Sequence, residues 1–344
     1  MIKLDRKIGG KDIVVESHDN MHFDEITALF LAEKFASHEF FDRYCPDGIL
    51  RLGVEGGPFD EHPVNGEPLK SGNECCTTLI AKALGVIDDP ALEKIIRFVI
   101  NTDLKGAGQP FDLASVVKQL YQKNDSKPEE VIEWATVGLE AKYQEQLRFF
   151  GNARNEFLNK AEIEDVQGPG GRILKMVVIV SDEENVCKFA RSSHGCNAAI
   201  VIQKQLSGNV QIYTNKQLRL VLFDTAQMIR LAEQEAKGQI IVDDWRELAS
   251  EGKVEGAEEW YFHHGGQMLL NGSLTAKNVP PTKLTLNQIK DIIRVGINPN
   301  AFEPKRKIEC ERGICTSTFN DPCFWYRIGL MRCRQVRYKM HDES

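Results

Sequence analysis

The chain has 344 residues, more than a single hydrophobic core usually serves, so two domains with an appendage are expected. Hydrophobic residues make up 42% and charged residues 27%, as in soluble globular proteins, and the net charge of −7 argues against a protein that coats nucleic acid with its whole surface. No apolar run approaches the roughly 18 residues that span a bilayer, and the sequence starts without a signal-like apolar core. We therefore expect a cytoplasmic protein without a membrane partner, in a reducing setting where the nine cysteines form no disulfide framework.

The first part of the chain alternates short strands with helices. An apolar run at 12–17 predicts a buried strand, and apolar residues recur at helical spacing over 26–41. A second strand is expected at 49–55, where a Gly-Gly-Pro cluster ends it. Three more helices are predicted, at 74–86, 90–101 and 112–123. Residues 1–125 are therefore expected to form an α/β domain around a mainly parallel sheet.

The rest of the chain is expected to form a helical connector, a second domain and a tail. A helical stretch covers roughly 129–162 and a Gly-Pro-Gly-Gly cluster follows, so 126–167 is the predicted connector. Strand, helix and strand then alternate, which predicts a smaller α/β domain over 168–297. The tail, 298–344, is rich in cysteine and basic residues. Such a tail either holds phosphates locally or docks on the acidic remainder of the chain.

Three potential metal ligands lie within seven residues, on the loop between the first predicted strand and helix. They are His18, His22 and Asp24. In open parallel sheets ligands bind at the carboxyl ends of strands, and imidazole with carboxylate suits Mn, Fe or Zn better than Ca or Mg. The alternative is an ordinary helix start, in which Asp24 and Glu25 meet the helix dipole.

A second group of polar residues follows the second predicted strand. Asp60, Glu61 and His62 are consecutive in a loop rich in Gly and Pro, and Asp103 follows a predicted helix. Alone, an Asp-Glu-His run in such a loop is usually a solvated turn, and Asp103 alone is uninformative. The order of these residues along the chain is what makes them notable.

Together, these segments resemble the DHH phosphoesterase superfamily, and most closely its Myg-type branch, a family regarded as metal-dependent hydrolases or RNA exonucleases. The first motif of the superfamily falls on His18, His22 and Asp24, with His22 in place of the first Asp, as in that branch. The likeness covers about residues 10–297. It implies a DHH-like metal-binding domain followed by a smaller substrate-binding domain.

The other motifs of the superfamily follow in the same order. The Asp-His-His motif falls on Asp60-Glu61-His62 and the fourth motif acid on Asp103. Glu61 stands where the family has a metal-binding His, and a carboxylate can bind the same metals. The second motif, an Asp that bridges two metals, has no counterpart here, and Glu55 is the only nearby acid. A one-metal site, or a site that binds without turnover, is therefore an open alternative.

The resemblance implies a division of roles among these residues. Two divalent ions about 3.5–4 Å apart would serve phosphodiester hydrolysis, with Mn expected and Mg, Fe or Zn as alternatives. The implied ligands are His18, His22, Asp24, Asp60, Glu61 and Asp103. Asp60 would bind the metal or orient a ligand. The implied catalytic histidines are His62, which would contact the phosphate or move a proton, and His18, which would bind or support the metal.

A further likeness lies in the predicted second domain. Residues 262–266 and Thr275 look like the His-and-glycine segment of the branch, which in the wider superfamily holds the nucleic-acid end of the substrate. The resemblance implies that His264, Gly265 and Gly266 bind a phosphate or a terminal nucleotide, since glycines allow close main-chain approach. The alternative is a satisfied pair of histidines beside a turn.

The expected function is that of a metal-dependent phosphodiesterase. Its substrate would be a short or single-stranded nucleic acid attacked from one end, or a nucleotide phosphodiester. One alternative is a non-catalytic nucleic-acid or nucleotide-binding protein with a degraded DHH site, and another is a hydrolase of a different small phosphorylated molecule. An oligomer is compatible with the sequence.

The tail carries four cysteines that the resemblance does not cover. Cys310, Cys315, Cys323 and Cys333 have the spacing C-x4-C-x7-C-x9-C. Four thiols in a short segment suit a tetrahedral zinc site, and the metal would help to fold it. The pattern lacks the C-x2-C knuckle of common zinc modules, so buried thiols or mixed use is the alternative.

Overall fold

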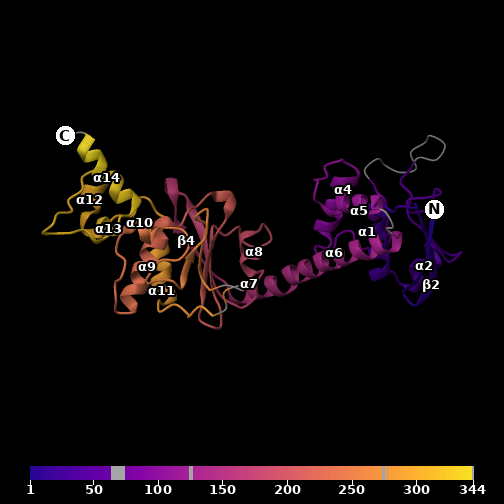
Figure 1. Ribbon diagram of the computed structural model, residues 1–344, viewed down its shortest axis with the longest axis horizontal. Helices are drawn as coiled ribbons and strands as arrows, with labels where there is room; N and C mark the ends of the chain where they lie inside the picture. The colour runs from indigo at the N-terminus through magenta and orange to yellow at the C-terminus, as the bar shows by residue number, and fades with distance from the viewer. Residues whose placement is uncertain (63–73, 124–126, 273–275, 277, 343–344) are drawn as a thin grey trace. The chain divides into compact units, whose positions relative to one another are not determined.

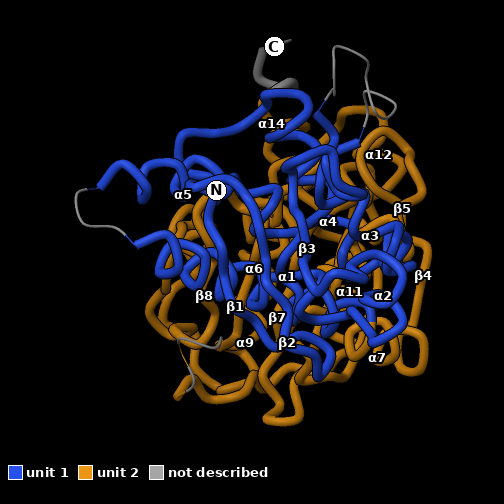
Figure 2. The backbone as a smooth tube through the Cα atoms, turned by 90° about the vertical axis from the view of Figure 1, so that its right-hand side faces the viewer, with its two compact units in different colours: residues 1–150 blue, residues 151–344 orange. Residues whose placement is uncertain are grey.

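The computed structural model describes residues 1–62, 74–123, 127–272, 276 and 278–342. The chain divides after Phe150 into two units, shown in Figures 1 and 2. In the described part of the chain, no helix is both long enough and apolar enough to cross a membrane. The boundary between the units lies inside the predicted connector, whereas the predicted boundary at residues 125 and 126 lies outside the described residues.

Unit 1 combines a small sheet with a group of helices. Its strands are β1 (Ile2–Ile8), β2 (Lys11–Ser17) and β3 (Ile49–Arg51). Its helices are α1 (Phe23–Phe35), α2 (His38–Tyr44), α3 (Cys76–Ala83), α4 (Glu93–Asp103), α5 (Leu113–Gln122) and α6 (Pro128–Arg148). The helix predicted over 26–41 is therefore two helices, and Ser37 accepts a hydrogen bond from the Phe40 N–H at the start of the second.

Helix α1 lies at the centre of unit 1. Every residue from Phe23 to Ala32 is buried, because α1 packs against β1, α3, α4, α5 and α6. A helix surrounded in this way must be apolar on all sides, as the run TALFLA is. The first turn of α1, with Asp24 and Glu25, is consequently inside the protein.

The three-stranded sheet brings the two predicted motif loops to one edge. Strand β2 is central: β1 pairs with it antiparallel through the Gly9-Gly10 turn, and β3 pairs with it parallel. Both glycines have positive φ, which suits a two-residue hairpin turn. Because β2 and β3 are parallel, the loops that leave their carboxyl ends emerge side by side. A hydrogen bond from Ser17 Oγ to the Leu52 carbonyl, 2.9 Å long, joins these loops.

Unit 2 is a six-stranded sheet covered by helices on both faces. Its strands are β4 (Glu162–Gln167), β5 (Ile173–Val180), β6 (Ile200–Lys204), β7 (Val210–Thr214), β8 (Trp260–Phe262) and β9 (Met268–Asn271). Its helices are α7 (Arg154–Lys160), α8 (Val186–Arg191), α9 (Phe223–Ala236), α10 (Trp245–Leu248), α11 (Leu286–Gly296), α12 (Lys307–Glu311), α13 (Phe324–Arg327) and α14 (Met331–Asp342). Short helical segments are η1 (Phe149–Ala153), η2 (Pro169–Gly171), η3 (Lys216–Leu218) and η4 (Pro304–Arg306). Helices α9 and α11 cover one face of the sheet and α7 and α8 the other (Figure 1).

The mainly parallel sheet predicted for residues 1–125 is not supported, because in unit 1 β2 pairs parallel with β3 over three residues but antiparallel with β1 over seven. The fold is mixed α/β with two mixed sheets. In unit 2 the strand order is β4-β5-β6-β7-β9-β8, and of its pairs only β5 with β6 is parallel. The parallel pair is the strand–helix–strand unit of β5, α8 and β6. Short turns join β6 to β7 and β8 to β9, and such turns force neighbouring strands to run antiparallel.

The connector is not the single helix that was predicted, and the tail is not a separate appendage. Helix α6 ends at Arg148, the π-helical segment η1 follows, and α7 ends at Lys160 before β4 begins. The end of the tail packs on unit 2, where Ile328 and Leu330 share a core with Leu231 of α9 and Leu248 of α10.

Candidate metal centre

Three groups of potential metal ligands lie in unit 1, and within each group the ligand atoms are no more than 4.8 Å apart. The groups are His18 with His22 and Glu25, Asp24 with Cys75 and Asp103, and Asp60 with Glu61 and His62. The groups adjoin one another: the His18 ring centroid is 5.8 Å from that of His62, and Asp103 lies within electrostatic reach of His22 and His62. The six residues predicted as ligands of this centre therefore all belong to these groups, together with Glu25, Cys75 and His62. The four tail cysteines, predicted as a possible second site, belong to none of them.

The secondary structure explains this convergence. His18 follows β2 directly, and His22 precedes the first residue of α1. The loop after β3 carries Asp60, and Asp103 is the last residue of α4. His18, His22 and Asp103 are thus anchored at the ends of regular elements, and Asp60 directly follows the bridge between Phe59 and Leu52.

Two of the histidines are held by carboxylates. His18 Nδ1 lies 3.0 Å from Glu25 Oε1, and His62 Nδ1 lies 2.8 Å from Asp60 Oδ1. A carboxylate on Nδ1 fixes the ring and its tautomer, so that Nε2 becomes the nitrogen that can bind a metal or exchange a proton. His22 Nδ1 is 3.6 Å from the same Glu25 oxygen, too far for a hydrogen bond.

Asp60 is built to orient His62. Its Oδ2 accepts a hydrogen bond from the Gly56 N–H (2.7 Å), and its Oδ1 accepts one from the His62 N–H (2.9 Å) as well as facing the His62 ring. Burial opposes ionisation of Asp60, but these hydrogen bonds outweigh it and hold the pKa of Asp60 below its ordinary value. Of the two roles predicted for Asp60, this geometry favours orienting a ligand.

Asp24 has a structural role as well as a place among the ligands. Its two carboxylate oxygens accept hydrogen bonds from the N–H groups of Cys76 (2.7 Å) and Thr77 (2.8 Å), the first residues of α3. The alternative in which Asp24 lies at a helix start therefore applies twice. Asp24 lies in the first turn of α1, and its carboxylate also accepts hydrogen bonds at the start of α3. A carboxylate offers about four lone pairs, so Asp24 retains acceptor capacity for a cation.

Glu25 and Glu61 are carboxylates whose buried surroundings would be stabilised by a bound cation. Each has a buried oxygen, Oε2, with no hydrogen-bond partner among the described residues. Burial, and after it the neighbouring acidic groups, raise the pKa of each to about 7. Burial and Asp24 also raise the pKa of Asp103. Unpartnered buried oxygens beside histidines and further carboxylates fit a divalent cation, which would supply the missing positive charge.

Glu25, Cys75 and Gly53 are the site residues that the sequence reasoning missed. Glu25 was assigned only to the helix dipole, although it follows His18 by seven residues and shares its loop-to-helix segment. Cys75 is buried, and burial together with Asp24 raises the pKa of its thiol, which makes it a weak metal ligand unless a cation displaces the proton. The structural signal for Gly53 is its contact with Glu25: a Cβ there would lie 2.9 Å from Glu25 Oε1.

Gly53→Ala is expected to weaken metal binding about 10-fold, because the new methyl group would displace the Glu25 carboxylate that holds His18. Gly53 also has φ +67, so part of any loss would be backbone strain of roughly 1 kcal/mol. Gly48→Ala is the matched control, since Gly48 has φ +75 and a methyl group added there would have no neighbour within 4 Å among the described residues. Calorimetric titration with Mn²⁺ measures the metal affinity of each variant. Equal affinities in Gly53→Ala and Gly48→Ala would contradict a role for Gly53 in the site.

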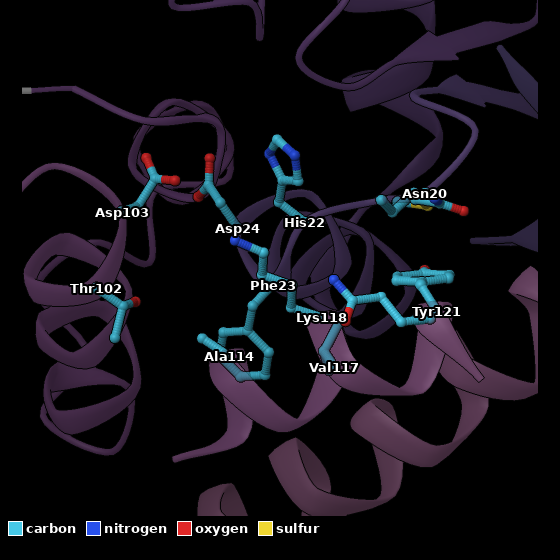
Figure 3. Close-up of a pocket in the computed structure, with 12 residues that line it drawn as sticks. Asn20, His22, Phe23, Asp24, Thr102, Asp103, Ala114, Val117, Lys118 and Tyr121 are labelled. Carbon is cyan, nitrogen blue, oxygen red and sulfur yellow. The ribbon is translucent and has the colours of Figure 1, made fainter. Parts of the chain in front are cut away.

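A cavity of about 490 Å³ opens beside the ligand groups. His22, Asp24 and Asp103 line it, and Figure 3 shows their polar ends gathered on one side. Lys118 of α5 extends into the same cavity toward the two aspartates (Figure 3). Its volume lies in the ordinary range of small-ligand pockets, about 300–1,000 Å³. A phosphate placed here would have both the ligand groups and a lysine ammonium within the same pocket.

Glu55, the only acid near the absent second motif, is not part of the site. It belongs to none of the three ligand groups, is exposed, and its Oε2 lies 3.4 Å from Arg51 Nε. Its φ of +58 is unusual for a residue other than glycine and turns the chain just before Gly56.

The predicted substrate-binding residues form a hairpin turn in unit 2. His264, Gly265 and Gly266 lie between β8 and β9, and both glycines have positive φ, which the turn requires. Glu251 accepts hydrogen bonds from His264 Nδ1 (2.7 Å) and the Gly265 N–H (3.1 Å). The His264 side chain is otherwise exposed, and its role with substrate stays a prediction, while Thr275 lies outside the described residues.

No model of a known protein family matches this chain. No curated protein is significantly similar to it either. The case for a function therefore rests on the chemistry and geometry of the ligand groups in unit 1.

Proposed function

We propose that unit 1 is the metal-dependent phosphodiesterase centre of a DHH-type protein, acting on an end of a short or single-stranded nucleic acid or on a nucleotide phosphodiester. The observation that carries the proposal is a pair of buried carboxylate oxygens, those of Glu25 and Glu61, that have no hydrogen-bond partner in the described part of the chain and lie among three histidines and further acids. Burying several carboxylates costs free energy when no cation is present, and a bound cation offsets that cost. The order of the DHH-type motifs along the chain supports the phosphoester class.

The metal would be held by the side chains that lie closest together. His18, His22 and Glu25 form one set of ligands, and Asp24, Asp103 and Glu61 supply further oxygens. Mixed imidazole and carboxylate ligands favour manganese, with iron, zinc or magnesium as alternatives. A bound divalent ion would neutralise charge on the phosphoryl oxygens and lower the pKa of the attacking water.

The remaining groups would handle protons and charge. His62, held through Nδ1 by Asp60, would move a proton at Nε2, either from the attacking water or to the alkoxide that leaves as the phosphorus–oxygen bond breaks. Lys118 would balance the negative charge of the phosphate in the cavity. In unit 2, His264 with Gly265 and Gly266 would bind a phosphate or a terminal nucleotide, as the resemblance to the DHH-type family implies.

One observation favours the competing proposal, a nucleotide- or nucleic-acid-binding protein without turnover. The acid that bridges two metals in the family has no counterpart, and Glu55 pairs with Arg51 instead of joining the ligand groups. A centre with a single metal would bind phosphate but activate water less well.

The proposal is tested by hydrolysis of bis(p-nitrophenyl) phosphate and of end-labelled short oligonucleotides, with the full chain and added Mn²⁺. We expect hydrolysis that EDTA abolishes and Mn²⁺ restores. His62→Gln should lower kcat about 100-fold without lowering the metal content, because Asp60 and His62 act on the proton. His38→Gln, an exposed histidine at the start of α2, is the control and should behave as wild type. Oligonucleotide binding without any cleavage would establish the competing proposal, and hydrolysis that survives EDTA would contradict both.

A further inference from the structure

The tail contains a segment that lacks an apolar core of its own. Within residues 304–323, all of which the structure describes, only Ser317 and Cys323 are buried. The larger apolar side chains face solvent: Ile308 is 61% exposed, Ile314 46% and Phe319 100%. The segment is nonetheless folded into η4, α12 and a series of turns. A short segment of this kind usually needs a cross-link or a metal to hold its shape.

All four tail cysteines line one small cavity. A space of about 10 Å³ is lined by Cys310, Cys315, Cys323 and Cys333, although the first and the last lie 23 positions apart along the chain. Cys310 is within electrostatic reach of Cys315 and Cys323, and Cys333 of Cys323 and Cys310. A cavity of this size holds about one small ion and excludes an organic ligand.

The walls of the cavity are held by polar contacts. Arg306 donates hydrogen bonds to the Thr316 carbonyl (2.9 Å) and the Asp321 carbonyl (3.1 Å), which pins both ends of the cysteine-bearing loop. Ser317 Oγ accepts a hydrogen bond from the Cys323 N–H (2.9 Å). These contacts fix the backbone next to Cys315 and Cys323 without filling the cavity with apolar groups.

The charges around the cysteines suit thiolates. Arg306 lies within electrostatic reach of Cys323, and the buried Arg332 within reach of Cys333. Four thiolates around a divalent ion leave an excess charge of about −2. The two guanidinium groups would offset it in part, since Arg306 also pairs with Asp321 and Arg332 with Asp224. Cys333 also borders the apolar core of Ile328 and Leu330, so this thiol contributes to packing as well. In the part of the chain that the structure describes, no cysteine forms a disulfide.

We propose that Cys310, Cys315, Cys323 and Cys333 form a four-thiolate metal centre, with zinc as the ion, that holds the tail between η4 and α14. The centre is separate from the ligand groups of unit 1 and does not depend on the proposed hydrolysis. Thiolate ligation is shared by zinc sites and iron–sulfur clusters, and the small cavity favours a single ion.

The test is elemental analysis of the full chain and its variants, purified without added metal. We expect one equivalent of zinc in the wild type and its loss in Cys323→Ser. Cys196→Ser, a half-buried cysteine outside the tail, is the matched control and should retain zinc. Glu61→Gln should retain it as well, so that failure of the unit 1 centre and failure of the tail centre are distinguishable.

A second measurement protects the test against misfolding. Cys315→Ser replaces a less buried ligand, and it should also release zinc and expose the basic residues of 305–327 to trypsin. Zinc that persists in both serine variants, or a wild type without bound metal, would overturn the proposal. Iron with inorganic sulfide and absorption near about 400 nm would support the thiolate centre but overturn zinc as its ion.

Discussion

Glu61→Gln is expected to abolish metal-dependent hydrolysis while making the metal-free protein more stable at pH 8. The change keeps the size of the side chain and removes its negative charge. Glu61 Oε2 has no hydrogen-bond partner among the described residues, so little is lost on the protein side. Removal of an anionic ligand should lower metal affinity and hydrolysis by at least about 100-fold. A substitution that abolishes hydrolysis while it raises the stability of the metal-free protein identifies a residue whose role is to bind the metal.

The sign of the stability effect follows from the pKa of Glu61, which burial raises from 4.5 to about 7. Because the folded state holds the proton more tightly, the contribution of Glu61 to the stability of the metal-free protein is fully present below pH 4.5 and is lost as pH rises through about 7. Above that pH the buried charge costs on the order of 2 kcal/mol, which glutamine avoids. Urea denaturation in EDTA at pH 5 and pH 8 should therefore show the gain only at the higher pH.

Bound metal reverses this pH dependence. A divalent ion replaces the protons on Glu61 and Glu25, so metal binding below pH 7 should release protons and strengthen as pH rises. Glu55→Gln is the control, because Glu55 is exposed and outside the ligand groups. It should keep its metal and change stability by less than about 0.5 kcal/mol. If Glu61→Gln binds Mn²⁺ as tightly as wild type, the proposed centre is wrong.

The convergence of the motif residues could be predicted because it depends on local features. The buried strand before His18 and the strand before Asp60 were both visible as apolar runs, and parallel pairing of β2 with β3 places their ends together. In the structure, His18, Asp60 and Asp103 belong to three adjoining ligand groups. The mainly parallel sheet expected in the first domain is not supported, because residues 2–8 were not recognised as a strand, and this strand, β1, pairs antiparallel with β2.

The missing parts of the site depend on packing between distant segments. Glu25 is one residue from Asp24, but its importance comes from the burial of the first turn of α1 by the surrounding helices. Gly53 matters because its backbone lies against Glu25, a contact between residues 28 positions apart. Neither relation leaves a periodic or compositional trace in the sequence.

Asp24→Ala is expected to lower the free energy of unfolding by about 3–5 kcal/mol even in the presence of EDTA, because it leaves two buried N–H groups without acceptors. Those groups belong to Cys76 and Thr77, both fully buried at the start of α3. The helix would also lose the negative charge near its N-terminus, which stabilises its dipole. Loss of metal in this variant would therefore not by itself identify Asp24 as a ligand.

Asp19→Ala is the matched control for this change, because Asp19 lies in the same loop and its side chain is 80% exposed. Its ion pair with the N-terminal amine, 2.6 Å long, should contribute less than about 1 kcal/mol. Urea denaturation of the three proteins in EDTA separates the structural contribution of Asp24 from metal binding. If Asp24→Ala matches the wild type there and differs only when Mn²⁺ is added, the hydrogen bonds to α3 are dispensable and Asp24 serves the metal alone. The expected large loss in EDTA would instead mean that one carboxylate both anchors α3 and faces the ligand groups, so the centre can form only when α1 and α3 are packed together.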